Sequence, residues 1–89
     1  MGNEKLRPNK DVISRRVRDE SVLVHLQSNQ MYSLNPTGAR AWDLLSEGFD
    51  RDAIEATIVE EYGVDGAEAR RELETLLDEL ERHQLVEGA

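Results

Sequence analysis

Hydrophobic and polar positions alternate along the first half of the chain, and this period of two predicts β-strands. The pattern covers "VISRRV" at Val12–Val17, "SVLVHLQ" at residues 21–27 and "QMYSL" at Gln30–Leu34. A polar "RDES" separates the first two segments, and a short "SNQ" turn separates the last two, with Asn29 suited to a left-handed conformation. The sequence therefore predicts an antiparallel hairpin plus one more strand.

The alternation also predicts which side chains of these strands face the core. In the second strand, Val22, Val24 and Leu26 fall on one face, and their β-branched and apolar character favours burial of that face. In the third strand, Tyr32 and Leu34 share a face. We expect these two faces to pack against the rest of the protein.

After Leu34 the hydrophobic period changes to that of a helix, and three helices are predicted. Asn35 is a good N-cap with Pro36 at the first helical position, Asp50 caps a second helix over about residues 51–62, and Asp65 begins the third. Gly48 and Gly63 are expected to end the first two helices. The predicted apolar stripes are Gly38, Ala41, Trp42, Leu44 and Leu45 in the first helix; Ile54, Ile58 and Tyr62 in the second; and Ala69, Leu73, Leu76, Leu77 and Leu80 in the third.

Strands followed by helices indicate an α+β fold, here a three-stranded antiparallel sheet followed by three helices. Two short helices and one long helix beside a small sheet are also the ingredients of a winged helix-turn-helix. Residues 1–11 are polar and are expected to form a flexible arm, and residues 12–86 one domain, with Leu85 and Val86 folding back onto the core.

The charge of the chain counts against nucleic-acid binding. Its 89 residues carry a net charge of −8, whereas a phosphate-binding face must be basic. A basic cluster of Arg15, Arg16 and Arg18 near the first strand is expected to be a solvated strand edge. An acidic winged-helix regulator that binds protein or DNA stays open as an alternative.

The residues for catalysis or metal binding are few. There is no cysteine, and neither of the two histidines, His25 and His83, belongs to a metal-binding motif. The carboxylates of the third helix lie away from its apolar stripe and are expected to pair with arginines, as in Glu68–Arg71 and Asp78–Arg82. We therefore expect no enzyme activity, no metal and no cofactor.

The sequence contains neither a secretory signal nor a membrane span. The N-terminus lacks an apolar signal region, and no apolar run approaches the roughly 20 residues of a spanning helix. We expect a cytoplasmic protein without a membrane partner, and a monomer.

The third strand is a candidate binding element because a small sheet has two open edges. If Gln30, Met31, Tyr32, Ser33 and Leu34 form an edge, an extended peptide could add a further strand there. The third helix could wall such a groove with Leu73 and Leu77, although these leucines also suit the core.

Several segments together resemble the PqqD-like family, whose members are also called RiPP recognition elements. They are "MYSLNPTGARAWDLLSEG", a helix ending "EEYGVD", and "ELETLLDELERHQLV", and the resemblance covers roughly residues 12–86. The resemblance implies a non-catalytic protein in which a precursor peptide's leader pairs with the third strand and lies in the cleft beside the third helix. It implies a peptide-binding site at Gln30–Leu34, with a helix wall of Arg70, Leu73, Glu74 and Leu77.

The resemblance also suggests a branch of the family. The true pyrroloquinoline-quinone protein usually carries a "PER"-like segment and a Cys-Asp-Gly turn, whereas this chain has "LNPTGAR" and "SEG". A stand-alone domain with "YSLNPTGA" looks more like the small leader-binding protein of lasso-peptide clusters. Such a protein works with a separate leader peptidase and a downstream cyclase, although similar domains also serve radical-enzyme pathways.

Overall fold

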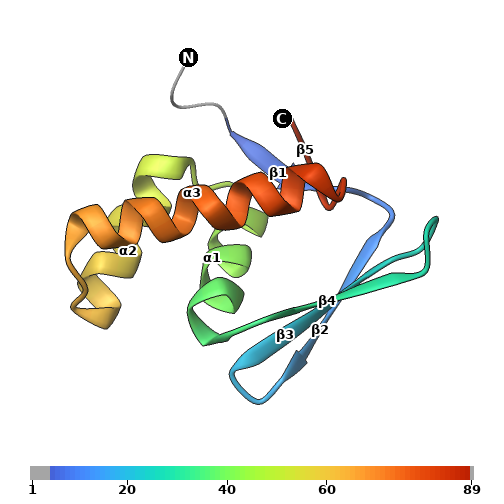
Figure 1. Ribbon diagram of the computed structural model, residues 1–89, viewed down its shortest axis with the longest axis horizontal. Coiled ribbons are helices and arrows are strands. Elements are labelled where there is room, and N and C mark those ends of the chain that lie inside the picture. Colours follow the sequence, from blue (N-terminus) through green and yellow to red (C-terminus); the bar gives the residue numbers. More distant parts are fainter. Residues whose placement is uncertain (1–4, 89) are drawn as a thin grey trace.

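The computed structural model describes residues 5–88 as a three-stranded sheet, a two-stranded sheet and three helices (Figure 1). The elements, in chain order, are β1 (Leu6–Pro8), β2 (Val12–Val17), β3 (Glu20–His25), β4 (Gln30–Leu34), α1 (Pro36–Ser46), α2 (Arg51–Tyr62), α3 (Gly66–Arg82) and β5 (Val86–Gly88). The predicted α+β class, with three antiparallel strands followed by three helices, is confirmed. The likeness to a winged helix-turn-helix stays a prediction.

The larger sheet is an antiparallel meander in the order β2-β3-β4. In its register, Leu23 of β3 lies opposite Tyr32 of β4, and Ser21 lies opposite Leu34. Asn29, in the β3–β4 turn, has the expected left-handed backbone, with φ +59°. This sheet projects from the helical part of the molecule and contacts α1 through β3 and β4 (Figure 1).

The face of β3 that packs against the core is the opposite of the one expected. Ser21, Leu23 and His25 are buried, whereas Val22 and Val24 are only partly buried and Leu26 is exposed. Leu23 is fully buried because its face of the sheet turns toward α1, as does the face of β4 that carries Leu34. Strand propensity alone was misleading, because β-branched residues also favour a half-exposed sheet surface.

Each helix begins at the predicted cap. The side-chain oxygens of Asn35, Asp50 and Asp65 accept hydrogen bonds from the backbone N–H groups of Gly38, Ala53 and Ala67, respectively. Gly63 ends α2 in a left-handed conformation, and Gly48, just after α1, has φ +96°. The helices then bury the core residues Ala41, Trp42, Leu44, Leu45, Ile54, Ile58, Ala69, Leu73, Leu77 and Leu80.

The two ends of the described chain lie side by side, which the sequence did not predict. Leu6–Pro8 pair antiparallel with Val86–Gly88, and Arg7 forms an ion pair with Glu87 at 3.1 Å. A flexible arm was expected over residues 1–11, but Leu6 packs against the core and anchors this strand. Residues 1–4 of that arm lie outside the described residues. Leu85 and Val86 are buried, so the predicted return of the C-terminal segment to the core is confirmed.

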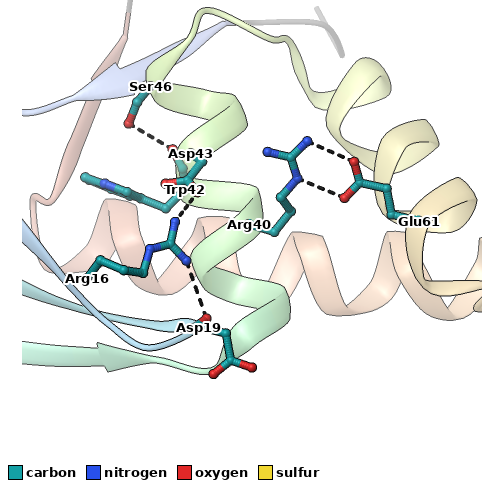
Figure 2. A network of polar contacts seen from close by, with 7 residues as sticks. All are labelled: Arg16, Asp19, Arg40, Trp42, Asp43, Ser46 and Glu61. Atoms are coloured by element: carbon teal, nitrogen blue, oxygen red, sulfur yellow. Dashed lines mark hydrogen bonds and ion pairs between the residues drawn. The ribbon is translucent and has the colours of Figure 1, made fainter.

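Polar contacts fix α1 to the elements on both sides of it (Figure 2). The Arg16 guanidinium of β2 donates to the Asp43 carboxylate of α1, while Arg40 forms a two-pronged pair with Glu61 of α2 at 2.8 Å. The hydrogen bonds from Arg40 lower the pKa of Glu61 below its ordinary value. Because α1 follows β4 directly, these contacts also hold the end of β4 in place.

Candidate functional site

β4 is an edge strand of the larger sheet. It pairs with β3 on one side and with no described strand on the other, so alternate backbone N–H and C=O groups face outward. The strand carries no charged residue, and Met31 is among the most exposed apolar side chains of the described chain. β4 therefore offers an unprotected edge of the kind to which another strand can pair.

A cavity of about 270 Å³ lies between β4 and the C-terminal half of α3. It is lined by Tyr32, Ser33, Leu34, Leu76, Glu79, Leu80, His83 and Leu85. Leu34, Leu80 and Leu85 are buried core residues, so the floor of this cavity is apolar and held by the packing of the core.

A larger cavity of about 430 Å³ adjoins this one and reaches the start of α1. The two cavities share Leu76 and Glu79, and we call them together the β4–α3 groove. The larger cavity is lined by Asn35, Thr37, Gly38, Ala41, Ile58, Ala69, Arg71, Glu72, Leu73, Thr75, Leu76 and Glu79. A Cβ on Gly38 would lie only 3.2 Å from the side-chain oxygen of the capping Asn35. Because glycine has no Cβ, the start of α1 can lie close to the end of β4.

A ring contact lies at the other end of the groove. The Tyr32 and His83 rings lie 4.6 Å apart between centroids and are tilted by 37°. The Tyr32 hydroxyl donates to the Gln30 amide oxygen at 2.6 Å, which holds the ring along the strand. β4 and the end of α3 are thus joined by side chains while the outer edge of β4 stays open.

Only some of the predicted site residues lie beside the two cavities. Gln30–Leu34 form the expected strand, and Leu73 lines the larger cavity. Arg70 instead donates to Glu55 of α2, a hydrogen bond that raises the pKa of Arg70. Glu74 is exposed and lines none of the cavities, and Leu77 is buried on another side of α3, where it lines a small cavity with Leu6 and Leu45.

The sequence left open which flank of α3 faces β4, and the lining of the cavity beside β4 identifies that flank. Leu76, Glu79, Leu80 and His83 line the groove, and they recur every three or four residues, as one face of a helix does. One sequence feature indicated this flank. Leu73, Leu77 and Leu80 are enough to form the core face of α3, so Leu76 makes the apolar stripe wider than the core requires. Which of these residues touch a peptide stays a prediction.

Neither a metal-binding cluster nor a membrane-spanning helix is found among the described residues. Within residues 5–88, no group of three or more His, Asp or Glu side chains is placed to hold a metal ion. Among the described helices, none combines the length and the hydropathy of a membrane-spanning segment.

Comparison with known proteins gives one family and two close structural matches. The family model of coenzyme PQQ synthesis protein D (PqqD) matches residues 20–86. The structure of TbiB1 in complex with the TbiA(beta) leader peptide is 36% identical in sequence, with a TM-score of 0.87 over 93% of this chain and 96% of that chain.

The second matching structure is lasso peptide synthetase B1 complexed with the leader peptide. It has 20% identity and a TM-score of 0.85 over 93% of this chain and 98% of that chain, and at this identity it supports the fold alone. No curated protein sequence matches the chain.

Proposed function

The chain belongs to the PqqD-like family of RiPP recognition elements, and from this premise we propose that it binds the leader of a ribosomally made precursor peptide. The leader adds as a strand to the open edge of β4 and lies in the β4–α3 groove. The observation that carries the proposal is that β4, the one edge strand without a charged residue among the described strands, lies beside a cavity with buried leucines in its lining.

Backbone pairing alone is too weak for this task. Each hydrogen bond contributes about 0.5–1.5 kcal/mol net, and four or five such bonds are offset by the cost of ordering a flexible peptide. The side-chain cavities supply the remainder, because burying one leucine-sized side chain contributes about 1.5–3 kcal/mol. Leu76, shared by the two cavities, lies where such side chains would be received.

We propose further that the bound leader is presented to a maturation enzyme, and that the protein itself is not an enzyme. The 36% identical TbiB1 was solved with a leader peptide, which supports leader binding as the role of this chain. The lasso-type pathway, with a separate leader peptidase and a cyclase acting later, is proposed from the resemblance carried by the "YSLNPTGA" segment.

A second candidate is a peptide chaperone for a quinone-cofactor or radical-enzyme pathway. It is favoured by the family model, which describes a coenzyme PQQ synthesis protein. The neighbouring genes distinguish the two candidates. A short precursor gene beside a transglutaminase-like protease and an asparagine-synthetase-like cyclase supports the lasso pathway, whereas a radical enzyme in their place supports the second candidate.

Amide hydrogen exchange tests the strand addition directly, using the leader of the precursor encoded next to the gene for this chain. In the free protein, every second amide of Gln30–Leu34 faces the open edge and exchanges fast. On leader binding, we expect those amides to become protected. The outward amides of β2, the opposite edge, serve as the control and should stay unchanged. No binding tighter than about millimolar, or protection at β2 in place of β4, would contradict the proposal.

A further inference from the structure

A polar pocket adjoins the β4–α3 groove at the first residue of β4. This pocket, called the polar pocket below, has a volume of about 270 Å³. Its lining residues are His25, Gln27, Ser28, Gln30, Arg82, His83 and Gln84. His83 belongs to both the polar pocket and the groove, so a peptide that follows β4 backwards from Leu34 reaches this pocket as it passes Gln30.

The polar pocket has no acidic residue in its lining, although the chain as a whole is acidic. The chain has 19 acidic residues, yet none of the residues that line the pocket is Asp or Glu. Asp11 lies outside the pocket lining, and its carboxylate accepts a hydrogen bond from the side-chain amide of Gln27 at 2.9 Å. The pocket thus combines one guanidinium and two imidazoles with neutral hydrogen-bonding side chains.

Arg82 is available for a ligand, whereas several other arginines are not. Arg7, Arg16, Arg40 and Arg70 each form an ion pair with a carboxylate. Arg82 has no ion pair within residues 5–88, so the pair with Asp78 expected from their spacing is wrong. Its five guanidinium donors are therefore free to bind a planar acceptor such as a carboxylate.

The end of α3 does not prevent an anion from binding here. A helix C-terminus carries partial negative charge on its last carbonyl groups. In α3 the carbonyls of Glu79, Leu80 and Glu81 accept hydrogen bonds from the backbone N–H groups of His83, Leu85 and Gln84. The full positive charge of Arg82 in the last turn outweighs the partial charge that remains.

His25 adds an oriented imidazole to the lining of the pocket. The buried imidazole accepts a hydrogen bond at Nδ1 from the Gln27 N–H, at 3.3 Å. A neutral histidine that accepts at Nδ1 carries its proton on Nε2, which is then a donor. The polar pocket therefore has an oriented imidazole beside the unpaired guanidinium of Arg82.

From these observations we infer that the polar pocket binds a carboxylate side chain of the peptide that occupies the groove. The inference rests on the proposed function and names one chemical feature of its ligand. Arg82 lies six residues along α3 from Leu76, or about 9 Å at the rise of a helix. An extended peptide covers that distance in about three residues. The ligand therefore carries Asp or Glu about three residues from the apolar side chain seated at Leu76.

Selection from a displayed library of random twelve-residue peptides tests this feature without knowledge of the natural leader. Peptides selected on the native protein should be enriched in Asp or Glu at one position, about three residues from an apolar anchor. The variant Arg82→Gln should keep the apolar anchor and lose the acidic preference, and Arg82→Glu should select Lys or Arg instead.

The matched control is Arg15→Gln, because Arg15 also has no ion pair within the described chain. Arg15 lies on β2 and lines none of the cavities described above, so its loss should leave the acidic preference intact. For one selected peptide, the native protein should bind the Asp form about three- to fivefold more tightly than the Asn form. Arg82→Gln should reduce this ratio to about one.

The outcomes separate this inference from the proposed function. Peptides that bind and protect the β4 amides but show no acidic preference, or an Asp/Asn ratio unchanged in Arg82→Gln, overturn the inference alone. Failure of any peptide or leader to bind overturns both.

Discussion

The two edges of the same sheet, β2 and β4, have opposite character. β2 carries Arg15 and Arg16, and none of its residues lines the cavities described above. Arg16 reaches back to Asp43 and ties this edge to α1. β4 has no charged residue and lies beside the groove.

This difference shows that open backbone groups alone do not make a binding edge. Charged side chains are a common way to protect an exposed edge strand from unwanted pairing, and β2 has them. β4 lacks that protection and has side-chain cavities next to it, so pairing there also buries apolar groups. Three measurements test this contrast and a fourth tests a contact away from both edges, and they are given from the largest expected effect to the smallest.

Leu76→Glu should reduce leader affinity at least about tenfold, because it replaces the apolar side chain shared by the two cavities with a second carboxylate beside Glu79. Leu76 is only partly buried, so the variant should still fold. Isothermal titration with the leader measures the effect. Ile13→Glu on β2, where the side chain is 53% exposed, is the matched control. Equal losses in the two variants would remove the distinction between the edges.

Tyr32→Ala should lower the free energy of unfolding by about 1–2 kcal/mol and also weaken leader binding. The variant removes the ring contact with His83 and part of the packing on the core. Urea denaturation and titration measure the two effects. Tyr62→Ala, at a more exposed tyrosine on α2, should change neither by as much. A Tyr32 variant with native affinity would show that this end of the groove is not used.

Arg16→Gln should lower the free energy of unfolding by less than about 1 kcal/mol, because its ion pair with Asp43 is largely exposed. Leader affinity should not change, since the proposed leader site lies at β4 and not at β2. Arg15→Gln, in the same strand but without an ion pair among the described residues, should be neutral in both assays. Reduced affinity in either variant would extend the binding surface to β2.

The smallest effect is expected for the pair between Arg40 and Glu61, which lies away from both edges. The hydrogen bond from Arg40 lowers the pKa of Glu61 below its ordinary value of 4.5. Because the folded-state pKa is the lower one, the pair stabilises the protein above pH 4.5, and this contribution is lost as the pH falls through the lowered value. Thermal denaturation between pH 7 and 3 should show a shallower loss for Glu61→Gln than for the native protein. An identical pH dependence in both would contradict this assignment.

Much of the fold followed from local patterns. The predicted β2, β4 and α2 agree with the structure, and the three capping residues act as expected, since a cap or an alternating run depends on nearby residues alone. The buried face of β3 and the strand at Leu6–Pro8 were not predicted. Both depend on partners distant in sequence: α1 for Leu23, and Val86–Gly88 for the first strand.

The candidate site likewise combines features that local sequence predicts with features that depend on distant partners. The sequence by itself determined that Gln30–Leu34 is a strand, that Asn35 and Pro36 end it abruptly, and that α3 has an apolar stripe, because periodicity and capping are local properties. Only the tertiary structure decided that β4 is an edge and that Leu76 and His83, not Arg70 and Glu74, face it. The rotation of a helix about its axis is set by how its neighbours pack on it. A stripe of leucines wide enough for both the core and the groove does not show which flank remains open.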